Sequence, residues 1–332
     1  MADYGSMVTD KAVAKTLAKI QKVYEEAERD LKKKMAAFVR KHQAQGTIMF
    51  NQLKNGQISQ AAYHSWMRGQ VFTGKRWQMK LFQAVRIFTK ATKVANDIIR
   101  KFKIYVFTEN YNRNAYQTEI QTGISFDIYN EDAVEKLIKE DPKMLPEWKI
   151  NEKKDYTWNR QKVENAITQG IIQGESVDQI ADRLAKELNS TNTNKMRMFA
   201  RTAMTGAQNA GRQKQMEDAV ARGINIRKQW IATLDDRTRD THQHLDGQIV
   251  KVDELFHVGT KQGQKTIRYP GDPTASPDMV YNCRCTMKSV FKVMEGQKRQ
   301  RRAYKWVGDH RESYLIDDMT YDEWKKWKEG QK

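Results

Sequence analysis

The first of the five prolines in this chain is Pro142. Proline removes a backbone donor and clashes with the preceding helical turn, so its absence permits long, uninterrupted helices before that point. Apolar side chains recur there at heptad spacings, at Val13, Leu17, Ile20, Tyr24, Ala27 and Leu31. This pattern predicts a helix from about residue 10 to about residue 42, whose apolar stripe needs a partner.

A second helical region is expected to supply that partner. Gly46 and the pair Asn55–Gly56 predict breaks after the first helix, and helical sequence resumes from about Ser59 to about Asn112 with an interruption at Gly74. Packing of the two stripes predicts an antiparallel helical hairpin or bundle, and an intermolecular coiled coil is the alternative. The second stripe comprises Trp77, Leu81, Val85, Phe88, Val94 and Ile98.

The middle of the chain is expected to connect this half to a second domain. Short helices are predicted at Ala115–Gln121 and Glu131–Glu140, each closed by a nearby glycine or proline. Three further helices are expected over Tyr156–Gln173, from Ser176 onward, and over Thr193–Arg222. Three helices joined by short turns also allow a helix-turn-helix interpretation.

After Gly223 the pattern changes to short strands separated by turn residues. A short helix is expected at Thr238–His244. Packed against the preceding long helix, these strands predict a small α+β unit, so the expected fold is mainly α with a small C-terminal α+β domain. The expected strands are Lys228–Leu234, Gln248–Val252, Thr266–Arg268 and Tyr281–Val290.

Positive charge is concentrated in the first third of the chain. Residues 1–105 hold 21 Lys and Arg against 7 Asp and Glu, which gives +14 of the total net charge of +18. Between Leu31 and Asn96 there are 13 basic residues and no acidic one. Such a stretch cannot neutralise itself, so it favours a nucleic acid or an acidic protein surface as partner.

A second basic run follows residue 297, with Tyr304 and Trp306 beside it. Phosphate binding with aromatic stacking is one interpretation, and a solvated face is the other. The residues predicted to contact DNA or an acidic partner are Lys32, Lys33, Lys34, Arg40, Lys41, Lys75, Arg76, Lys80, Arg86, Arg299, Arg301 and Arg302.

Several classes of protein are disfavoured by what the sequence lacks. No apolar run approaches the roughly 18 residues that span a bilayer, so no membrane partner is expected. The N-terminal residues do not resemble a signal peptide, which predicts assembly in the cytoplasm. Phosphate-cradling and zinc-protease motifs are also absent. The two cysteines are separated by one residue and are poor disulfide partners.

The 57 residues from Trp230 to Thr286 concentrate the chemistry of the chain. Both cysteines, three of the six histidines and three of the five prolines lie there. The blocks in it are W-x-A-T-x-D-x-R-T-R at Trp230–Arg239, H-x-x-L-D-G at His242–Gly247, Y-P-G-D at Tyr269–Asp272 and C-R-C at Cys283–Cys285.

This ordered set resembles the C-terminal domain of the phage head morphogenesis family, the minor head proteins typified by the F protein of phage Mu. The preceding helix, with Arg201-Thr-Ala-Met-Thr and Asn209-Ala-Gly-Arg212, is similar to the family's lead-in, so the resemblance covers about residues 155–290. The expected domains are 1–112, a basic helical hairpin or bundle; 113–150, a connecting region; 151–292, the Mu F-like domain; and 293–332, a basic and aromatic tail.

The thiols of Cys283 and Cys285 with the imidazole of His242 form a candidate zinc site, because these are the donors that zinc prefers. Related sequences often carry a histidine where Val280 stands here, so a fourth ligand would have to be His244, His257 or Asp246. The alternative is that both cysteines are buried without a metal.

Other residues of the block are predicted to shape it. Asp235 and Asp236 are expected to form ion pairs with Arg237 and Arg239 as an electrostatic staple, with a catalytic role as the alternative. The Y-P-G-D segment is turn chemistry. The residues assigned to this structural motif are Trp230, Asp235, Arg237, Thr238, Asp246, Gly247, Pro270, Gly271 and Asp272.

The resemblance implies a structural minor head protein without enzymatic activity. It implies low copy number at the portal vertex, inside the capsid of a tailed phage, and a role in head assembly and in DNA packaging or ejection. The implied partners are the portal protein, capsid and scaffold proteins, and double-stranded DNA bound without sequence preference. Two rivals are a metal-dependent nuclease that uses His242, His244 and Asp246, and a general DNA-binding module.

Overall fold

The computed structural model describes residues 4–69, 75–145, 151–173, 175, 177–233, 235–261, 263–291, 300–307 and 310–317. Among these, the side chains of residues 4, 35–44, 68, 75–78, 80, 81, 152, 171, 177, 178, 300–307 and 310–317 are not described. The chain forms two compact units, each built from separate segments. The helical unit comprises Leu17–Ile98 and Lys149–Arg197, and the sheet unit comprises Met1–Thr16, Ile99–Trp148 and Met198–Lys332.

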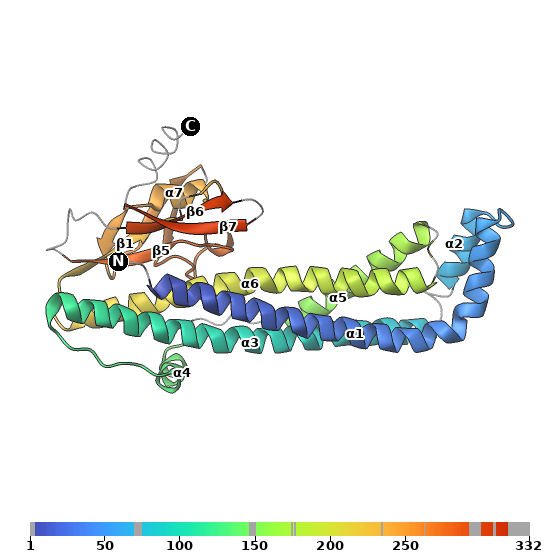
Figure 1. Cartoon of the computed structure of the whole chain (residues 1–332), viewed down its shortest axis with the longest axis horizontal. Coiled ribbons are helices and arrows are strands. Elements are labelled where there is room, and N and C mark those ends of the chain that lie inside the picture. The colour runs from blue at the N-terminus through green and yellow to red at the C-terminus, as the bar shows by residue number, and fades with distance from the viewer. Residues whose placement is uncertain are drawn as a thin grey trace. The chain divides into compact units, whose positions relative to one another are not determined.

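The first helix, α1, runs over Tyr4–Lys54 and is longer than the sequence predicts (Figure 1). The break expected at Gly46 is wrong: a single helical glycine costs only about 1 kcal/mol, which neighbouring turns can absorb. The break at Asn55–Gly56 is confirmed, and Gly56 takes the left-handed φ of 70° that ends helices.

Ser59 caps the second helix, α2 (Gln60–Arg68), by accepting a hydrogen bond from the amide of Ala62 at 3.1 Å. The third helix, α3, runs over Lys75–Thr122 and therefore continues past the end expected at Asn112. The short helix predicted at Ala115–Gln121 is the last part of α3, closed by Gly123 with a φ of 69°.

Within the helical unit, α1 and α3 pack along the predicted stripes. Tyr24 and Phe88 stack with ring centroids 6.2 Å apart, and the hydroxyls of Tyr24 and Thr92 lie 3.0 Å apart. The placement of Val94 in the stripe is wrong, since it is 42% exposed. The buried positions that follow Phe88 in the helical unit are Ala91, Thr92 and Ala95, small residues that the periodicity of large apolar side chains alone does not single out.

The helix predicted at Glu131–Glu140 is confirmed as α4, and α5 runs over Glu152–Ile172. The next helix, α6 (Val177–Ala221), is continuous, so the break expected before Thr193 is wrong and no turn remains there for a helix-turn-helix. Residues 189–193 are poor helix formers, but their polar groups bond within the unit. Asn192 donates to the Leu188 carbonyl at 2.8 Å and to Asn159 at 2.9 Å.

The sheet unit contains a three-stranded antiparallel sheet in the order β2-β1-β5. A separate hairpin, β3-β4, and the two short helices α7 and α8 also belong to this unit. The bounds are β1 Ile226–Ile231, α7 Asp240–Leu245, β2 Ile249–Lys251, β3 Phe256–Thr260, β4 Gly263–Ile267, α8 Pro277–Val280 and β5 Thr286–Phe291.

The sequence missed β3 and placed the start of the last strand too early. Tyr281 follows α8, and Asn282 takes a left-handed φ of 55°, so β5 begins only at Thr286. The alternation in β1 is regular: Ile226, Lys228 and Trp230 are buried, and the intervening residues are more exposed.

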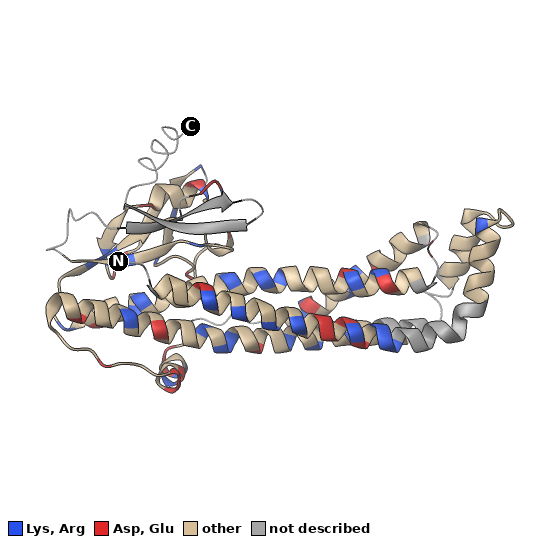
Figure 2. Ribbon diagram, in the orientation of Figure 1, with Lys and Arg blue, Asp and Glu red and all other residues tan. Residues whose placement is uncertain are grey.

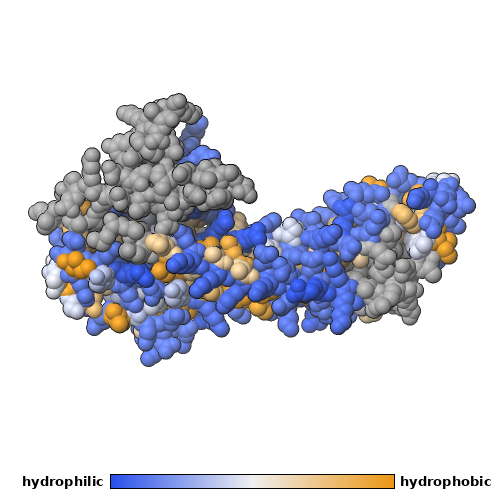
Figure 3. All heavy atoms as spheres, viewed as in Figure 1, coloured by the Kyte–Doolittle hydropathy of each residue, from blue (hydrophilic) through white to orange (hydrophobic). Residues whose placement is uncertain are grey.

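The described part of the expected C-terminal tail forms two strands. Strands β6 (Gln300–Val307) and β7 (His310–Asp317) form an antiparallel hairpin. Arg301 and Arg302 lie on β6 but their side chains are not described, and Arg299 lies outside the described residues. Hydrophilic residues cover most of the coloured surface in Figure 3, with small apolar patches between them. None of the helices in the described ranges is long and apolar enough to cross a membrane.

Candidate functional site

Three predicted metal ligands come together in the sheet unit. His242 projects from α7, and Cys283 and Cys285 lie between α8 and β5. Nδ1 of His242 lies 3.3 Å from Sγ of Cys285 and 3.6 Å from Sγ of Cys283. One donor atom from each of the three residues lies within 4.8 Å of the others. Both cysteines are free thiols, as the sequence predicts.

The trio is enclosed by the core of this unit. His242, Cys283 and Cys285 are 2%, 2% and 3% exposed, and Trp230 is fully buried beside them. The indole of Trp230 meets the imidazole edge to face, with centroids 5.5 Å apart. Further core residues around the trio are Ala232, Leu245, Phe256, Val258, Ile267, Met279 and Val280.

The surroundings of the two thiols shift their pKa values in opposite directions. The hydrogen bond with Cys285 lowers the pKa of Cys283, and the nearby guanidinium groups of Arg239 and Arg284 act in the same direction. The same hydrogen bond, together with burial, raises the pKa of Cys285. Of the two thiols, Cys283 is therefore the one whose ionisation its surroundings favour.

None of the fourth ligands that the sequence suggested joins this trio. His244 is exposed and its Nδ1 lies 2.7 Å from the Asp240 carbonyl. His257 is exposed on β3, and Asp246 accepts a hydrogen bond from the amide of Ala232 at 2.8 Å. Since His242 points inward and His244 outward, the nuclease arrangement of His242, His244 and Asp246 is not assembled.

The carboxylate of Asp235 forms its ion pair with a different arginine from those predicted. Arg284, the central residue of C-R-C, grips the buried Asp235 carboxylate with two guanidinium nitrogens, one of them at 2.7 Å. Arg237 is exposed, and Arg239 instead donates to the Tyr281 carbonyl. The predicted partners of Asp235 are arginines close to it in the chain, whereas the observed partner, Arg284, lies 49 positions away.

The turn predicted at Tyr269–Asp272 is confirmed. Gly271 has a φ of 80°, and the Asp272 carboxylate accepts from the Thr274 amide two residues on at 3.0 Å. Burial alone would raise the pKa of Asp272, but hydrogen bonds from Arg268 at 2.7 and 2.8 Å and from Thr274 hold it below its usual value.

A polar seam on α6 holds this turn and the C-R-C segment in place. The seam comprises Thr202, Thr205, Asn209 and Arg212, spaced 3, 4 and 3 residues apart on one face of the helix. Thr205 donates to the Cys283 carbonyl at 2.9 Å, and Thr202 accepts from the Asn282 amide at 3.0 Å.

Asn209 is the centre of the seam and is fully buried. Its amide nitrogen donates to the Pro270 carbonyl at 3.0 Å and to the Cys285 carbonyl at 3.3 Å. Its oxygen accepts from the Met287 amide at 3.2 Å. The sequence resemblance included these α6 residues without a role; a polar stripe at heptad spacing is the signal that indicates one.

Arg212 extends the seam to the start of β5. Its guanidinium donates to the Met287 carbonyl at 2.8 Å and to the Thr286 hydroxyl at 2.7 Å. A third bond joins it to Asn110 of α3 at 3.3 Å. One buried cation therefore ties α3, α6 and β5 together within the sheet unit.

Lys228 is an inward-facing cation on β1 that the sequence analysis did not single out. It is 1% exposed, donates to the Arg268 carbonyl at 2.9 Å and lies over the Phe256 ring at 5.3 Å. Burial lowers the pKa of Lys228 to about 8. A lysine at an inward position of an alternating strand is the signal that could have identified it.

We expect Lys228 to make stability depend on alkaline pH. Because its pKa falls from 10.5 in the unfolded chain to about 8 on folding, its contribution is lost as pH falls through 8 and grows towards 10.5. Between about pH 7 and about pH 9 the gain is about 1 kcal/mol relative to Lys228→Met. Urea unfolding of both proteins across this range measures it, and equal pH slopes would contradict the expectation.

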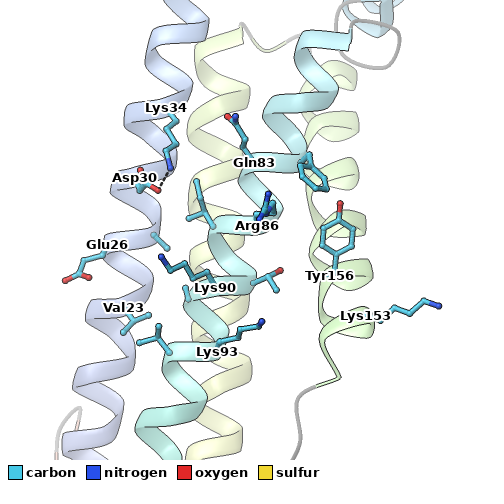
Figure 4. A pocket seen from close by; sticks show the side chains of 16 residues that line it. Val23, Glu26, Asp30, Lys34, Gln83, Arg86, Lys90, Lys93, Lys153 and Tyr156 are labelled. Carbon is cyan, nitrogen blue, oxygen red and sulfur yellow. Dashed lines mark hydrogen bonds and ion pairs between the residues drawn. The ribbon is translucent and has the colours of Figure 1, made fainter.

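A groove of about 1370 Å³ lies in the helical unit between α1, α3 and α5. Its floor includes apolar side chains such as Val23 and Ile87. Five basic residues line it against two acidic ones, as Figure 4 shows. The basic residues are Lys34, Arg86, Lys90, Lys93 and Lys153, and the acidic ones are Glu26 and Asp30.

The predicted DNA-contacting residues are only partly described. Lys33 and Arg86 are exposed, and basic residues recur along parts of α1, α3 and α6 (Figure 2). Lys32 and Lys34 form ion pairs with Glu28 and Asp30 at 2.8 and 2.7 Å. The side chains of Arg40, Lys41, Lys75, Arg76 and Lys80 lie outside the described set.

Comparison with known proteins identifies the family. The family described as "Phage Mu protein F like protein" matches residues 161–288, which include α6, the seam and the cysteine trio. The minor head protein GP7 of Bacillus phage SPP1 is 33% identical over 238 residues, which cover 68% of this chain and 70% of that protein. This chain belongs to the Mu F-like family of phage minor head proteins. It is therefore a structural protein of a phage head.

Two further relatives share smaller parts with this minor head protein. The NAD(+)–arginine ADP-ribosyltransferase EFV of Enterococcus faecalis is 37% identical over 164 residues, 49% of this chain and 31% of that protein. An uncharacterised protein of Haemophilus influenzae is 26% identical over 172 residues, 48% of this chain and 34% of that protein. No solved structure matches the chain.

Proposed function

We propose that this minor head protein binds in low copy at the portal vertex, inside the capsid, and acts in head assembly and in DNA packaging or ejection. The observation that carries the proposal is the likeness to the SPP1 minor head protein over 68% of the chain. In this proposal the sheet unit docks on the portal or on capsid and scaffold proteins. The helical unit contacts double-stranded DNA.

The chemistry of the two units supports assigning docking to the sheet unit and DNA contact to the helical unit. The sheet unit is tied together by buried polar bonds, which suits a rigid docking element. Among the described basic side chains of the acid-free stretch, Lys32 and Lys34 pair with the carboxylates of Glu28 and Asp30 at its edge. Its remaining positive charge supports backbone contact with DNA, which needs cations but no base-specific geometry.

The first experiment is co-purification of the tagged chain with the portal protein of the same phage, at low and high salt and with nuclease treatment of parallel samples. We expect the association to survive both treatments, because docking by a folded, partly apolar surface does not depend on DNA. Loss of all association after nuclease would show that DNA is the bridge and would overturn the portal assignment.

DNA binding by the helical unit is expected to weaken steeply with salt. Neutralising Lys33, Arg86 and Lys90 to glutamine should lower the slope of log affinity against log salt by about 2 to 3, since each lost phosphate contact removes about 0.9. Fluorescence anisotropy with a short duplex measures the slope. The control triple replaces Lys136, Lys139 and Lys143, exposed lysines of the acid-balanced α4 region.

An unchanged slope in the Lys33, Arg86 and Lys90 triple would contradict DNA contact through these side chains. If that variant instead lost binding to a head protein and kept its affinity for DNA, the acidic partner would be a protein. A slope lowered equally in the control triple would mean that DNA senses only the net charge of the chain.

We propose that this chain carries no ADP-ribosyltransferase activity. The region shared with the Enterococcus protein covers 31% of that protein, so most of its length lies outside the match. The test is incubation with NAD and a guanidino acceptor such as free arginine. Release of nicotinamide that depends on this chain would overturn the proposal.

A further inference from the structure

We propose that His242, Cys283 and Cys285 bind one zinc ion. A tetrahedral zinc with bonds of about 2.1 Å to nitrogen and about 2.3 Å to sulfur places the two ligand atoms about 3.6 Å apart. The distances from Nδ1 of His242 to the two sulfurs are 3.3 and 3.6 Å. The trio therefore already has nearly the spacing that a zinc ion at its centre imposes.

The donor set selects the class of metal. Two thiolates with one imidazole favour zinc over magnesium or calcium, which take oxygen ligands. The donors are also withdrawn from water, since each of the three side chains is at most 3% exposed. Burial of a polar trio in an apolar core is costly unless its atoms are satisfied, and a metal satisfies all three together.

The other imidazole nitrogen gives an independent observation. Nε2 of His242 is buried and has no hydrogen-bond partner among the described residues. The orientation of the ring is therefore set by Nδ1, which faces the two sulfurs. In the described ranges no further His, Cys, Asp or Glu joins the cluster, so the three side chains would supply three of the four positions of a tetrahedral zinc ion.

The ion would act as a clamp. It would join α7 to the segment that leads into β5, and this segment is also held by the polar seam through Thr205 and Asn209. The docking unit would thus be fixed from two sides, by zinc on the core side and by α6 on the other. This inference does not depend on where in the head the protein sits.

The test uses the full chain, purified without added metal and assayed for metal content. We expect about one zinc per chain, a lower melting temperature after chelation, and recovery on adding zinc. Titration of the apoprotein with Co²⁺ should give the absorption of tetrahedral cobalt bound to thiolate. Cys285→Ser should weaken zinc binding by more than the roughly 10–100-fold that loss of an outer-shell partner costs.

The matched control is His244→Ala, which removes an exposed histidine two residues from His242 and should keep full zinc content. If Cys285→Ser does not fold, the chelation and cobalt measurements on the unmutated chain still decide whether the trio binds zinc. A chain that holds no zinc, gives no thiolate–cobalt band and melts at the same temperature with and without chelator would overturn the proposal. The trio would then be a hydrogen-bonded His–Cys cluster.

Discussion

Replacing Asn209 with alanine is expected to lower the free energy of unfolding of the sheet unit by about 4 kcal/mol. The side chain is fully buried and bonds the Pro270 carbonyl, the Cys285 carbonyl and the Met287 amide. Each group left unpaired in the interior costs about 1–3 kcal/mol, and alanine cannot replace any of these bonds. Urea unfolding, with hydrogen exchange of the α6 amides to localise the loss, measures the effect.

The control is Asn194→Ala, an exposed asparagine on the same helix. Its removal should change stability by less than about 0.5 kcal/mol, or raise it slightly through the better helix propensity of alanine. If Asn209→Ala lowered the free energy of unfolding no more than Asn194→Ala, the hydrogen bonds of the seam would not contribute to the stability of the fold. A larger zinc loss in Asn209→Ala than in the control would show that the seam and the cysteine trio are coupled.

The long helices were predictable because their signals are local. A heptad stripe and the absence of proline predict the helix over about residues 10–42, which forms the central part of α1 (Tyr4–Lys54), and Asn55–Gly56 marks its end. The boundaries inside α3 and α6 were not predictable in this way. The polar run at residues 189–193 looks like a break until Asn159, from another helix, supplies a partner for Asn192.

The candidate metal site was also largely predictable, since His242, Cys283 and Cys285 are distinctive residue types in one short block. Its supports were not, because they depend on distant segments. Arg284 reaches Asp235 across 49 positions, and Asn209 reaches Cys285 across 76. The C-R-C motif therefore serves two purposes in the structure: its cysteines face His242, and its arginine holds the strand-to-helix turn.

Gly211→Ala is the second large effect and is expected to destabilise the sheet unit by about 2–3 kcal/mol. A Cβ at this position would clash with the Phe107 carbonyl oxygen and would lie 3.2 Å from the Tyr111 amide nitrogen of α3. Both atoms belong to the backbone of a helix, so relief requires α3 and α6 to move apart. The helix propensity of alanine returns only about 1 kcal/mol, which is less than the strain of overpacking.

The matched control is Gly69→Ala, a glycine with helical φ and ψ of −57° and −40° and no atom within 4 Å of a new Cβ. There alanine should be neutral or stabilise the fold by up to about 1 kcal/mol, because only the propensity term remains. If Gly211→Ala lowered the free energy of unfolding and Gly69→Ala raised it, close backbone contact between α3 and α6 would be established as the reason for glycine at position 211. If Gly211→Ala were as harmless as Gly69→Ala, the two helices would not approach this closely in solution. The bond from Arg212 to Asn110, which needs the same approach, would then lose its structural basis.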